Sequence, residues 1–322
     1  MFDMITLGDA TIDTLIEVGD ASVACSVDRR NCLLQLRYGD KLPVENMAQK
    51  VAGNAANNAV GCARLGMRTA IHTILGVDQS GDAIVQTFVE NKVSREFVER
   101  DRKHATNAST VIRFQGDRTI LVYHAPRAYK LPKLPRSKWI YFTSLAAGHK
   151  AYNAQVIAHT ERTGTRLAYN PGTYQFLEGI DEVKKVIAVT HALFVNVEEA
   201  QRIVGKKSVK ECLRALYKLG AAMVFITDGP KGATAYDGEE MYFMPILRTK
   251  VIERTGAGDS FAVGVIAALN EGVSMATALT WGAANSSSVI LQVGPQDGLL
   301  YRNEIEAFYR KYGKGIRPKK IS

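Results

Sequence analysis

The fold is decided by the stretch 192–226, which reads Ala192-Leu193-Phe194-Val195, a polar break at Asn196-Val197-Glu198-Glu199, a helical pattern over 209–219, and then Met223-Val224-Phe225-Ile226. Two further apolar runs, 139–142 and 167–169, extend the same alternation of strand and helix toward the N-terminus. Short, unbroken apolar strands separated by helices are typical of a parallel sheet that helices cover. We therefore expect an α/β fold.

The N-terminal half has a pattern richer in strands. A strand over 4–7 ends at Gly8-Asp9, and a helix of small residues is predicted over 54–65, with Gly66 as its stop. Strands are also predicted over 109–114 and 119–123, with a hairpin turn at 115–118 between them, and the segment 33–38 alternates like a strand. Because there are no internal repeats or linker-like stretches, we expect one domain over 1–322, with lid segments at about 11–50 and 105–127.

The composition is ordinary for a soluble globular protein, with 322 residues, 46% of them hydrophobic and 23% charged. No apolar run reaches membrane-spanning length and the N-terminus has no secretion-signal pattern, so we expect no membrane partner and a cytoplasmic location. The four cysteines lack zinc-ligand spacing, which favours reduced thiols. The net charge of +9 weakly favours an anionic ligand. Its scatter in pairs and in a C-terminal cluster gives no support for nucleic acid as a partner.

The run Arg254-Thr255-Gly256-Ala257-Gly258-Asp259-Ser260 carries the strongest chemical signal. A strand-like segment over 249–252 precedes it, and an apolar helical pattern follows it. Two glycines at such a junction let backbone amides converge at a helix N-terminus, where they favour a phosphoryl group in transfer. A carboxylate there would repel phosphate, so Asp259 makes sense as a base that accepts a hydroxyl proton. Taken alone, Asp259 is equally well explained as an acidic residue in the first turn of a helix.

Two other segments each have two interpretations. Gly53, Asn54 and Asn57 permit close backbone approach and offer hydrogen-bonding groups to sugar-like hydroxyls, but they also suit an asparagine-capped helix start. Asn196 and Glu199 share a helix face at the carboxyl edge of the sheet, where they suit a water-bound Mg²⁺ and triphosphate oxygens. The same pair has the spacing of a capping box, and the two interpretations are compatible.

The turn over 227–232 follows another predicted strand, and its glycines suit backbone contact with a nucleotide, although an ordinary turn explains them equally well. Three common motifs are absent from the sequence: a Walker P-loop, a Gly-x-Gly-x-x-Gly after the first strand, and a Gly-x-Ser-x-Gly nucleophile. Their absence disfavours a Walker-type NTPase, a nicotinamide dehydrogenase and a serine hydrolase.

Taken together and in order, these segments resemble the PfkB carbohydrate-kinase family, also called the ribokinase-like family. The resemblance runs from Gly8 to about Gly298 and rests on the ordered set Gly8-x-x-x-x-Asp13, Gly53-Asn54-x-x-Asn57, Leu65-Gly66, Asn196-x-x-Glu199, Thr227-x-Gly229-x-x-Gly232 and Gly256-Ala257-Gly258-Asp259. It implies a three-layer α/β/α fold with a β-sheet lid. It also implies transfer of the γ-phosphoryl of ATP, with Mg²⁺, to an alcohol.

The resemblance implies a role for each matching residue. Substrate hydroxyls would be held by Asp13, Gly53, Asn54 and Asn57. Asp259 would be the catalytic base, with Gly256, Ala257 and Gly258 as the anion hole. Glu199 would serve the metal, and the nucleotide would be bound by Asn196, Thr227, Gly229 and Gly232.

The sequence departs from the family pattern in three places. Ala52 replaces the first glycine of the usual Gly-Gly pair. Glu253 replaces an aspartate near which relatives often bind a monovalent cation, so potassium activation is left open, and Arg254 adds a positive charge close to the phosphoryl path. Asn285 stands two positions after Ala283, where relatives often have an asparagine beside the adenine.

The expected acceptor is a sugar, with a nucleoside as the alternative. A nucleoside needs an apolar slot for its base, and Phe114 and Tyr123 in the lid are the candidates for that slot. A non-catalytic regulator ranks lower, because the base and the expected anion hole are both present. Since 33–38 looks like an edge strand without a partner, a homodimer through the lid is also expected.

Overall fold

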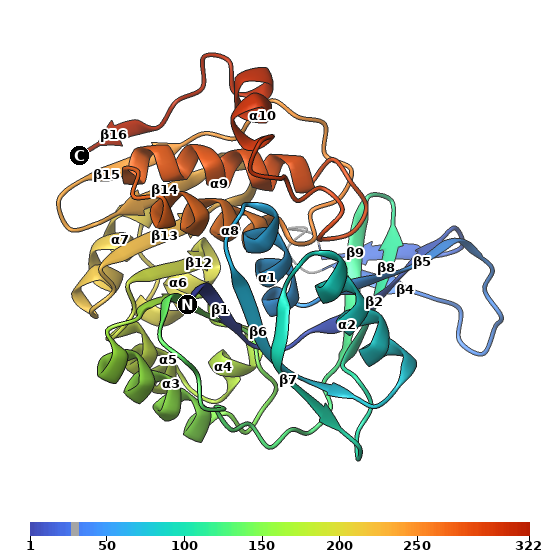
Figure 1. The fold of residues 1–322 in the computed structure, drawn as a ribbon. Coiled ribbons are helices and arrows are strands. Elements are labelled where there is room, and N and C mark those ends of the chain that lie inside the picture. Colours follow the sequence, from blue (N-terminus) through green and yellow to red (C-terminus); the bar gives the residue numbers. More distant parts are fainter. Residues whose placement is uncertain (27–31) are drawn as a thin grey trace.

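The computed structural model describes residues 1–26 and 32–322, in which ten strands form one large sheet (Figure 1). Its order is β16-β15-β14-β13-β12-β11-β10-β1-β6-β7. The parallel strands are β1 (Phe2–Leu7), β6 (Thr69–Gly76), β7 (Ser94–Asp101), β10 (Ser137–Phe142), β11 (Arg166–Tyr169), β12 (Ala192–Asn196) and β13 (Met223–Thr227). Three antiparallel strands complete one edge: β14 (Ala233–Tyr236), β15 (Met241–Met244) and β16 (Lys319–Ile321). The prediction of a mainly parallel sheet is confirmed.

Helices cover both faces of this sheet, which gives three layers (Figure 1). One face carries α3 (Lys150–Thr163), α4 (Thr173–Leu177), α5 (Ile180–Ile187), α6 (Val197–Val204) and α7 (Val209–Lys218). The other carries α1 (Asn54–Arg64), α2 (Gln79–Glu90), α8 (Ala257–Asn270) and α9 (Met275–Val289), with α10 (Ile305–Tyr312) packed on α9. Successive residues of a strand point to opposite faces. In β10, Ile140 and Phe142 accordingly join one core cluster, while Trp139 and Tyr141 join the other.

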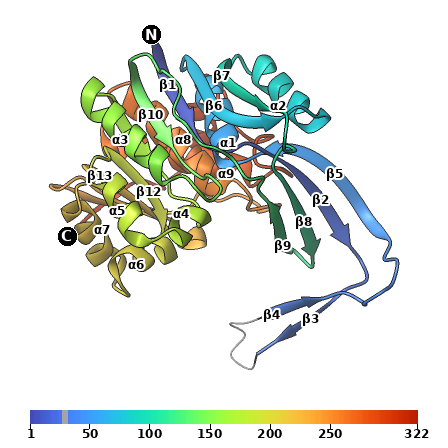
Figure 2. The ribbon, with the colours of Figure 1, turned by 90° about the horizontal axis from the view of Figure 1, so that it is seen from below.

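A small second sheet stands away from the large one, and we refer to it as the lid sheet because it comprises the segments expected to form the lid (Figure 2). Its order is β5-β2-β8-β9, from β5 (Val44–Ala52), β2 (Thr11–Val18), β8 (Ala108–Phe114) and β9 (Asp117–Tyr123). A separate hairpin, β3 (Ser22–Cys25) and β4 (Cys32–Gln35), projects beyond it. These strands come from the two segments expected to form the lid, of which residues 27–31 lie outside the described residues.

Two of the predicted strands need correction. The segment 249–252 is not a strand, although its composition is strand-like: Val251 and Ile252 are about half exposed, and no sheet neighbour covers them. The expected helix does begin after it, but a loop and not a strand leads into α8. The second correction concerns 33–38, where the strand spans only Cys32–Gln35. The hairpin turn between β8 and β9 is confirmed, and Gln115 and Gly116 both have positive φ there.

The expectation of reduced thiols is wrong for two of the four cysteines. Cys25 and Cys32 form a disulfide, because the antiparallel register of β3 and β4 sets the two residues opposite each other. A spacing of seven residues had no recognisable disulfide signature. Cys62 and Cys212 are free and buried.

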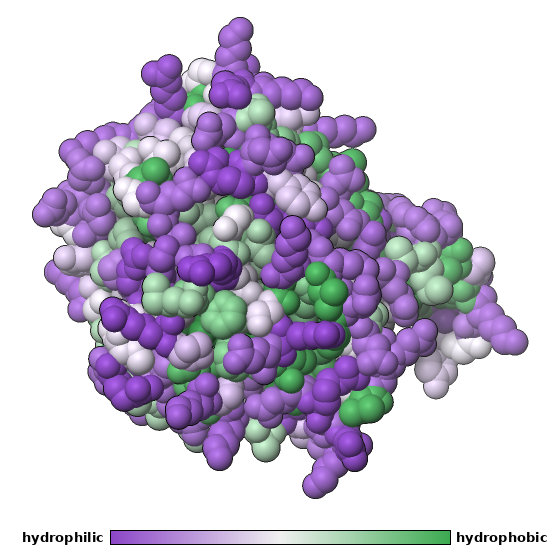
Figure 3. All heavy atoms as spheres, in the orientation of Figure 1, coloured by the Kyte–Doolittle hydropathy of each residue, from purple (hydrophilic) through white to green (hydrophobic). Residues whose placement is uncertain are grey.

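Apolar side chains are exposed on the lid, whereas hydrophilic residues dominate most of the face seen in Figure 3. The exposed lid residues include Val23, Leu33, Leu36, Tyr38, Val44, Met47, Ile120, Leu121, Val122 and Tyr123. None of the helices in the described part of the chain is both long and apolar enough to cross a membrane.

Candidate active site

Helix α8 begins at the glycine-containing segment where the sequence predicted a helix N-terminus. Gly256 precedes the helix with φ of 77°, and a Cβ atom there would lie 2.6 Å from Cβ of Pro295, so only glycine fits. Gly258 has open space around its α-carbon. The first amides of a helix have no partner within it. The Ala257 amide donates to the backbone oxygen of Arg254 over 3.3 Å. The other amides at the start of α8 and the positive end of the helix dipole face the surrounding space.

Asp259 lies in the first turn of α8 and contacts α1. The Asn57 side-chain amide donates a hydrogen bond to Oδ2 of Asp259 over 2.9 Å. Burial raises the pKa of Asp259 to about 6, and the hydrogen bond from Asn57 acts in the opposite direction. A carboxyl group with a pKa near neutrality both holds and releases a proton at physiological pH, as a general base must. Asn57 and Asp259, 202 positions apart in the sequence, are thus brought together.

Gln296 is a third member of this group that the sequence patterns did not reveal. Its side-chain amide donates to Oδ1 of Asn57 over 3.1 Å, and the side chain is buried. Arg64 of α1 fixes the loop by donating to the carbonyl oxygens of Gln296 and Leu299 over 2.7 and 3.2 Å. Gln296 lies in a loop with no chemical motif, so only the folded chain shows its neighbour.

Asp13 and Gly53 lie where the lid meets the body. A Cβ on Gly53 would come within 2.7 Å of the backbone oxygen of Asp9, so glycine permits β5 to turn into α1 at this place. Asp13, on β2, is buried and accepts a hydrogen bond from Thr11 over 3.0 Å. Burial raises the pKa of Asp13, against the effect of the hydrogen bonds from Thr11 and Ser109, and the charge of Glu253 raises it further.

A contact between lid and body occurs beside Asp13. Lys50 of β5 pairs with Asp13 across the lid sheet, and its ammonium group lies 2.6 Å from the carboxylate of Asp297 in the body. Both side chains of this ion pair are partly exposed. Ala52, which replaces the usual glycine, is buried opposite Thr11 in the same strand pair. Asn54 is the half-buried first residue of α1.

Asn196 and Glu199 form the capping box that their spacing predicts. The Asn196 side chain accepts from the Glu199 amide over 2.8 Å, and the Glu199 carboxylate accepts from the Asn196 amide over 2.9 Å. Burial raises the pKa of Glu199, the Asn196 amide lowers it, and the charge of nearby Asp259 raises it again. Only one oxygen of Glu199 is used by the capping box.

The described residues contain no group of three or more side chains suited to hold a metal ion alone. Mg²⁺ usually keeps several waters and is held by one or two carboxylates together with substrate phosphates. A single carboxylate with one oxygen available, near the expected phosphoryl path, fits an ion of that kind. Glu199 is the residue that would hold it, through water.

The turn 227–232 lies next to Asn196. Asn196 and Thr227 are neighbours across β12 and β13, at the carboxyl ends of both strands. Gly229 and Gly232 have φ of 48° and 101°, and a Cβ on Gly232 would lie 2.3 Å from the backbone oxygen of Met244. The predicted nucleotide-binding residues therefore share one edge of the sheet.

A buried polar network around Asp9 was also missed from the sequence. The Asp9 carboxylate accepts from the Tyr129 hydroxyl over 2.9 Å and from the Ala146 amide over 3.0 Å, and His124 Nδ1 lies 3.0 Å from it. Because the backbone of Asp9 lies close to Gly53, the network borders the junction between the lid and the body. The six histidines do not cluster in the sequence, so His124 gave no signal.

Of the residues that depart from the family pattern, Glu253 and Asn285 have structural partners, whereas Arg254 is exposed. Both oxygens of buried Glu253 accept hydrogen bonds, from the Thr255 hydroxyl over 2.7 Å and from the Gly294 amide over 3.0 Å. Asn285 is fully buried; it donates to the backbone oxygen of Ser260 over 2.8 Å and accepts from the Leu300 amide over 3.0 Å. Asn285 thus fastens α9 to α8.

Phe114 and Tyr123 do not form one slot. Phe114 stands opposite Asp117 and Tyr123 opposite Ala108, so the two aromatic residues lie at opposite ends of the β8–β9 hairpin. Six residues of strand separate these ends, a distance of roughly 20 Å. Phe114 and Tyr123 therefore cannot line a single slot together within one chain.

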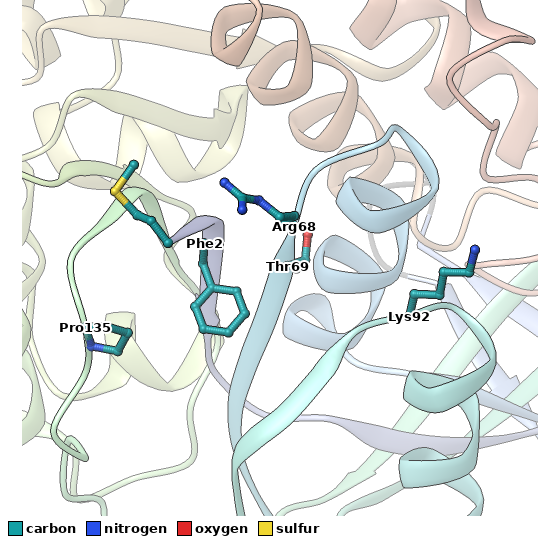
Figure 4. A pocket seen from close by; sticks show the side chains of 6 residues that line it. Phe2, Arg68, Thr69, Lys92 and Pro135 are labelled. Atoms are coloured by element: carbon teal, nitrogen blue, oxygen red, sulfur yellow. The ribbon is translucent and has the colours of Figure 1, made fainter.

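A shallow pocket lies at the opposite, amino-terminal edge of the sheet (Figure 4). Its lining is Met1, Phe2, Arg68, Thr69, Lys92 and Pro135. Phe2 and Thr69 begin β1 and β6, whereas the candidate residues follow the carboxyl ends of strands. In open α/β sheets ligands bind at the carboxyl ends, so this pocket is separate from the candidate site.

Comparisons with known proteins agree with the fold and the motifs. The model of the pfkB family of carbohydrate kinases matches residues 14–300. An ATP-dependent 6-phosphofructokinase from Thermoanaerobacterium thermosaccharolyticum is 24% identical, over 96% of this chain and 94% of its own length. A ribokinase from Bacillus subtilis is 26% identical, over 79% of this chain and 86% of its own length.

Solved structures show the same fold. Arabidopsis thaliana ribokinase, in complex with ribose and ATP, aligns with a TM-score of 0.79 at 19% identity and covers 95% of this chain and 98% of its own. A nucleoside kinase from Burkholderia thailandensis, in complex with inosine, aligns with a TM-score of 0.77 at 19% identity and covers 96% and 99%. Since the family model spans most of the sequence, this protein belongs to the pfkB family of carbohydrate kinases.

Proposed function

We propose that this kinase transfers the γ-phosphoryl group of ATP to a hydroxyl group of a sugar, with Asp259 as the general base. The observation that carries the proposal is the position of Asp259: a carboxyl group with a pKa of about 6, in the first turn of α8, held by Asn57. Carboxyl groups with a pKa raised in this way occur preferentially at functional sites.

In the proposed step, the acceptor oxygen forms a bond to the γ-phosphorus while the bond from that phosphorus to the ADP oxygen breaks. The hydroxyl proton passes to the Asp259 carboxylate, and ADP leaves with the electron pair of the broken bond. The amides of Gly256, Ala257 and Gly258 stabilise the charge on the phosphoryl oxygens during transfer. Asp13, Gly53, Asn54 and Asn57 hold the acceptor so that its oxygen faces the phosphorus.

For the donor, we propose that Asn196, Thr227, Gly229 and Gly232 contact ATP at the carboxyl edge of β12 and β13. When bound, Mg²⁺ supplies positive charge to the triphosphate, and Glu199 orients its water ligands. No monovalent cation is included in the proposed mechanism, because both oxygens of Glu253 accept protein hydrogen bonds.

Asp259→Asn tests the assignment of the base. The variant keeps the size and the hydrogen-bonding oxygen but cannot accept the proton, so we expect ATP binding within about twofold of the parent and a loss of at least ~100-fold in kcat. Asp181→Asn is the matched control, because Asp181 is also acidic, lies in the first turn of α5 and is exposed. Turnover of Asp259→Asn close to that of Asp181→Asn would contradict the proposal.

The alternative acceptor is a nucleoside, because relatives of that activity share the fold. Loss of the Phe114–Tyr123 slot favours a sugar, and the net charge of +9 favours an anionic one. A thermal-shift panel with a non-hydrolysable ATP analogue should contain free sugars, sugar phosphates, sugar acids and nucleosides. A shift confined to nucleosides would overturn the choice of a sugar.

Three further features belong to the proposal. The chain acts as a single kinase domain over 1–322, with the second sheet as its lid.

Two copies pair through the exposed apolar residues of β5 and β9, which are the unpartnered edges of that sheet. The enzyme works in the cytoplasm, where ATP is plentiful; cytoplasmic disulfides such as that of Cys25 and Cys32 are found in organisms that grow at high temperature.

A further inference from the structure

The side chains of Gln296, Asn57 and Asp259 form a line of hydrogen bonds that leads to the Asp259 carboxylate. Gln296 donates through Nε2 to Oδ1 of Asn57, and Asn57 donates through Nδ2 to Oδ2 of Asp259. The Asn57 amide has one acceptor and one donor end. When its oxygen faces Gln296, its NH₂ group must face Asp259.

The reverse orientation has a chemical consequence. If an acceptor replaced the Gln296 donor, the Asn57 amide would turn, and its oxygen would then face the carboxylate of Asp259. Two facing oxygens repel unless a proton lies between them, so the turned amide favours the protonated form of Asp259. A protonated Asp259 cannot accept the proton of the acceptor hydroxyl.

We propose that Gln296 is a positioning residue that keeps Asp259 in its basic form by fixing the orientation of the Asn57 amide. Gln296 itself touches neither the base nor the acceptor. It acts from a loop that Arg64 anchors to α1, so the backbone of Gln296 is held in place by the body of the enzyme. This inference rests on the proposed role of Asp259.

Other ionisable groups around Asp259 are few in the described chain. Tyr141 of β10 and Glu199 of α6 respond to the charge of Asp259, and burial raises the pKa of both side chains. Tyr141 is neutral at the pH values of interest. Glu199 is unchanged in the variants described below, so its contribution cancels between them.

The main test compares Gln296→Glu with Gln292→Glu. Gln292 lies four residues earlier and is exposed, so the control makes the same chemical change away from Asn57. We expect the acid limb of the kcat/KM pH profile to move up by about one pH unit or more in Gln296→Glu, with about a fivefold loss at pH 6. The profile of Gln292→Glu should match that of the parent. Because ATP titrates in the same way in every assay, a difference between the two variants comes from the protein.

Gln296→Met supplies a second test without a new charge. In a double-mutant cycle with Asn57→Ala, we expect Gln296→Met to lower kcat about tenfold in the parent and to cost nothing further when Asn57 is already absent. Equal losses in both backgrounds, with an unmoved pH profile for Gln296→Glu, would show that Gln296 only supports the fold. Thermal unfolding of each variant identifies losses that come from instability.

The two proposals fail in different ways. If Asp259→Asn loses turnover while both Gln296 variants behave like Gln292→Glu, the role of Gln296 is wrong and the base is right. If Asp259→Asn retains turnover, the proposed base is wrong, and the role of Gln296 is withdrawn with it.

Discussion

Replacing Asp259 by asparagine should stabilise the folded protein at neutral pH, although it should abolish turnover. The folded-state pKa of Asp259 is raised from its ordinary value, so the folded carboxyl group keeps its proton to a higher pH than the unfolded one. Between about pH 4 and pH 6 the folded state therefore binds more protons, and the free energy of unfolding falls as the pH rises. Asparagine does not titrate, so the free energy of unfolding of Asp259→Asn does not fall for this reason as the pH rises.

The size of the effect follows from the two pKa values. The pKa of Asp259 rises from 3.8 to about 6, and each pH unit between folded and unfolded values corresponds to about 1.4 kcal/mol. The upper limit is ~3 kcal/mol at pH 8. Because the Asp259 side chain is only half-buried, water screens part of this penalty, and we expect between about 1 and 3 kcal/mol.

Urea unfolding of the parent and of Asp259→Asn at pH 8 and at pH 4 measures the effect. We expect the variant to be more stable at pH 8 and the two proteins to be equal near pH 4, where the penalty is absent. Asp181→Asn, at an exposed helix start, should change neither value. A difference that is the same at both pH values, or a less stable variant at pH 8, would refute the reasoning about the pKa of Asp259.

Three other predictions concern the lid and the hairpin beyond it. Leu121→Asp places a charge among the exposed apolar residues of β9, so light scattering should show a monomer where the parent is a dimer; a parent that is already monomeric contradicts the proposed pairing. In denaturant without reductant, thiol titration should find two thiols per chain, and four after reduction, because Cys25 and Cys32 are joined. Since the β3–β4 hairpin is exposed and separate from both sheets, Cys25→Ser with Cys32→Ser should leave the unfolding midpoint of the body unchanged, and a large drop would show that the hairpin supports it.

Much of the fold was predictable because buried parallel strands consist of short runs of consecutive apolar residues. The runs 139–142, 167–169, 192–195 and 223–226 all lie within strands of the large sheet. Helix α1 also followed its prediction closely. The run 249–252 has the same composition but no neighbour to pair with, and pairing depends on the whole chain and not on the segment.

The site was predictable where residues act through the backbone of their own segment. Gly256 and the capping box of Asn196 and Glu199 are local features, and local spacing reveals them. Gln296 and His124 act through partners more than 100 positions away, so no pattern in their own segments could identify them. The Cys25–Cys32 disulfide depended on the register of a hairpin, which the sequence left undefined.

The loop 294–297 has a consequence for how this enzyme can change. Each of its four residues meets a different region: the segment before α8, the start of α8, helix α1 and the lid. Inserting or deleting one residue would displace every later residue of the loop from its own contact. A substitution would disturb only the contact of the residue that is replaced. This loop should therefore tolerate single substitutions better than insertions or deletions. An engineer who exchanges the lid to obtain a new acceptor should leave the loop's length untouched and adapt only its last residue, Asp297, to the new lid.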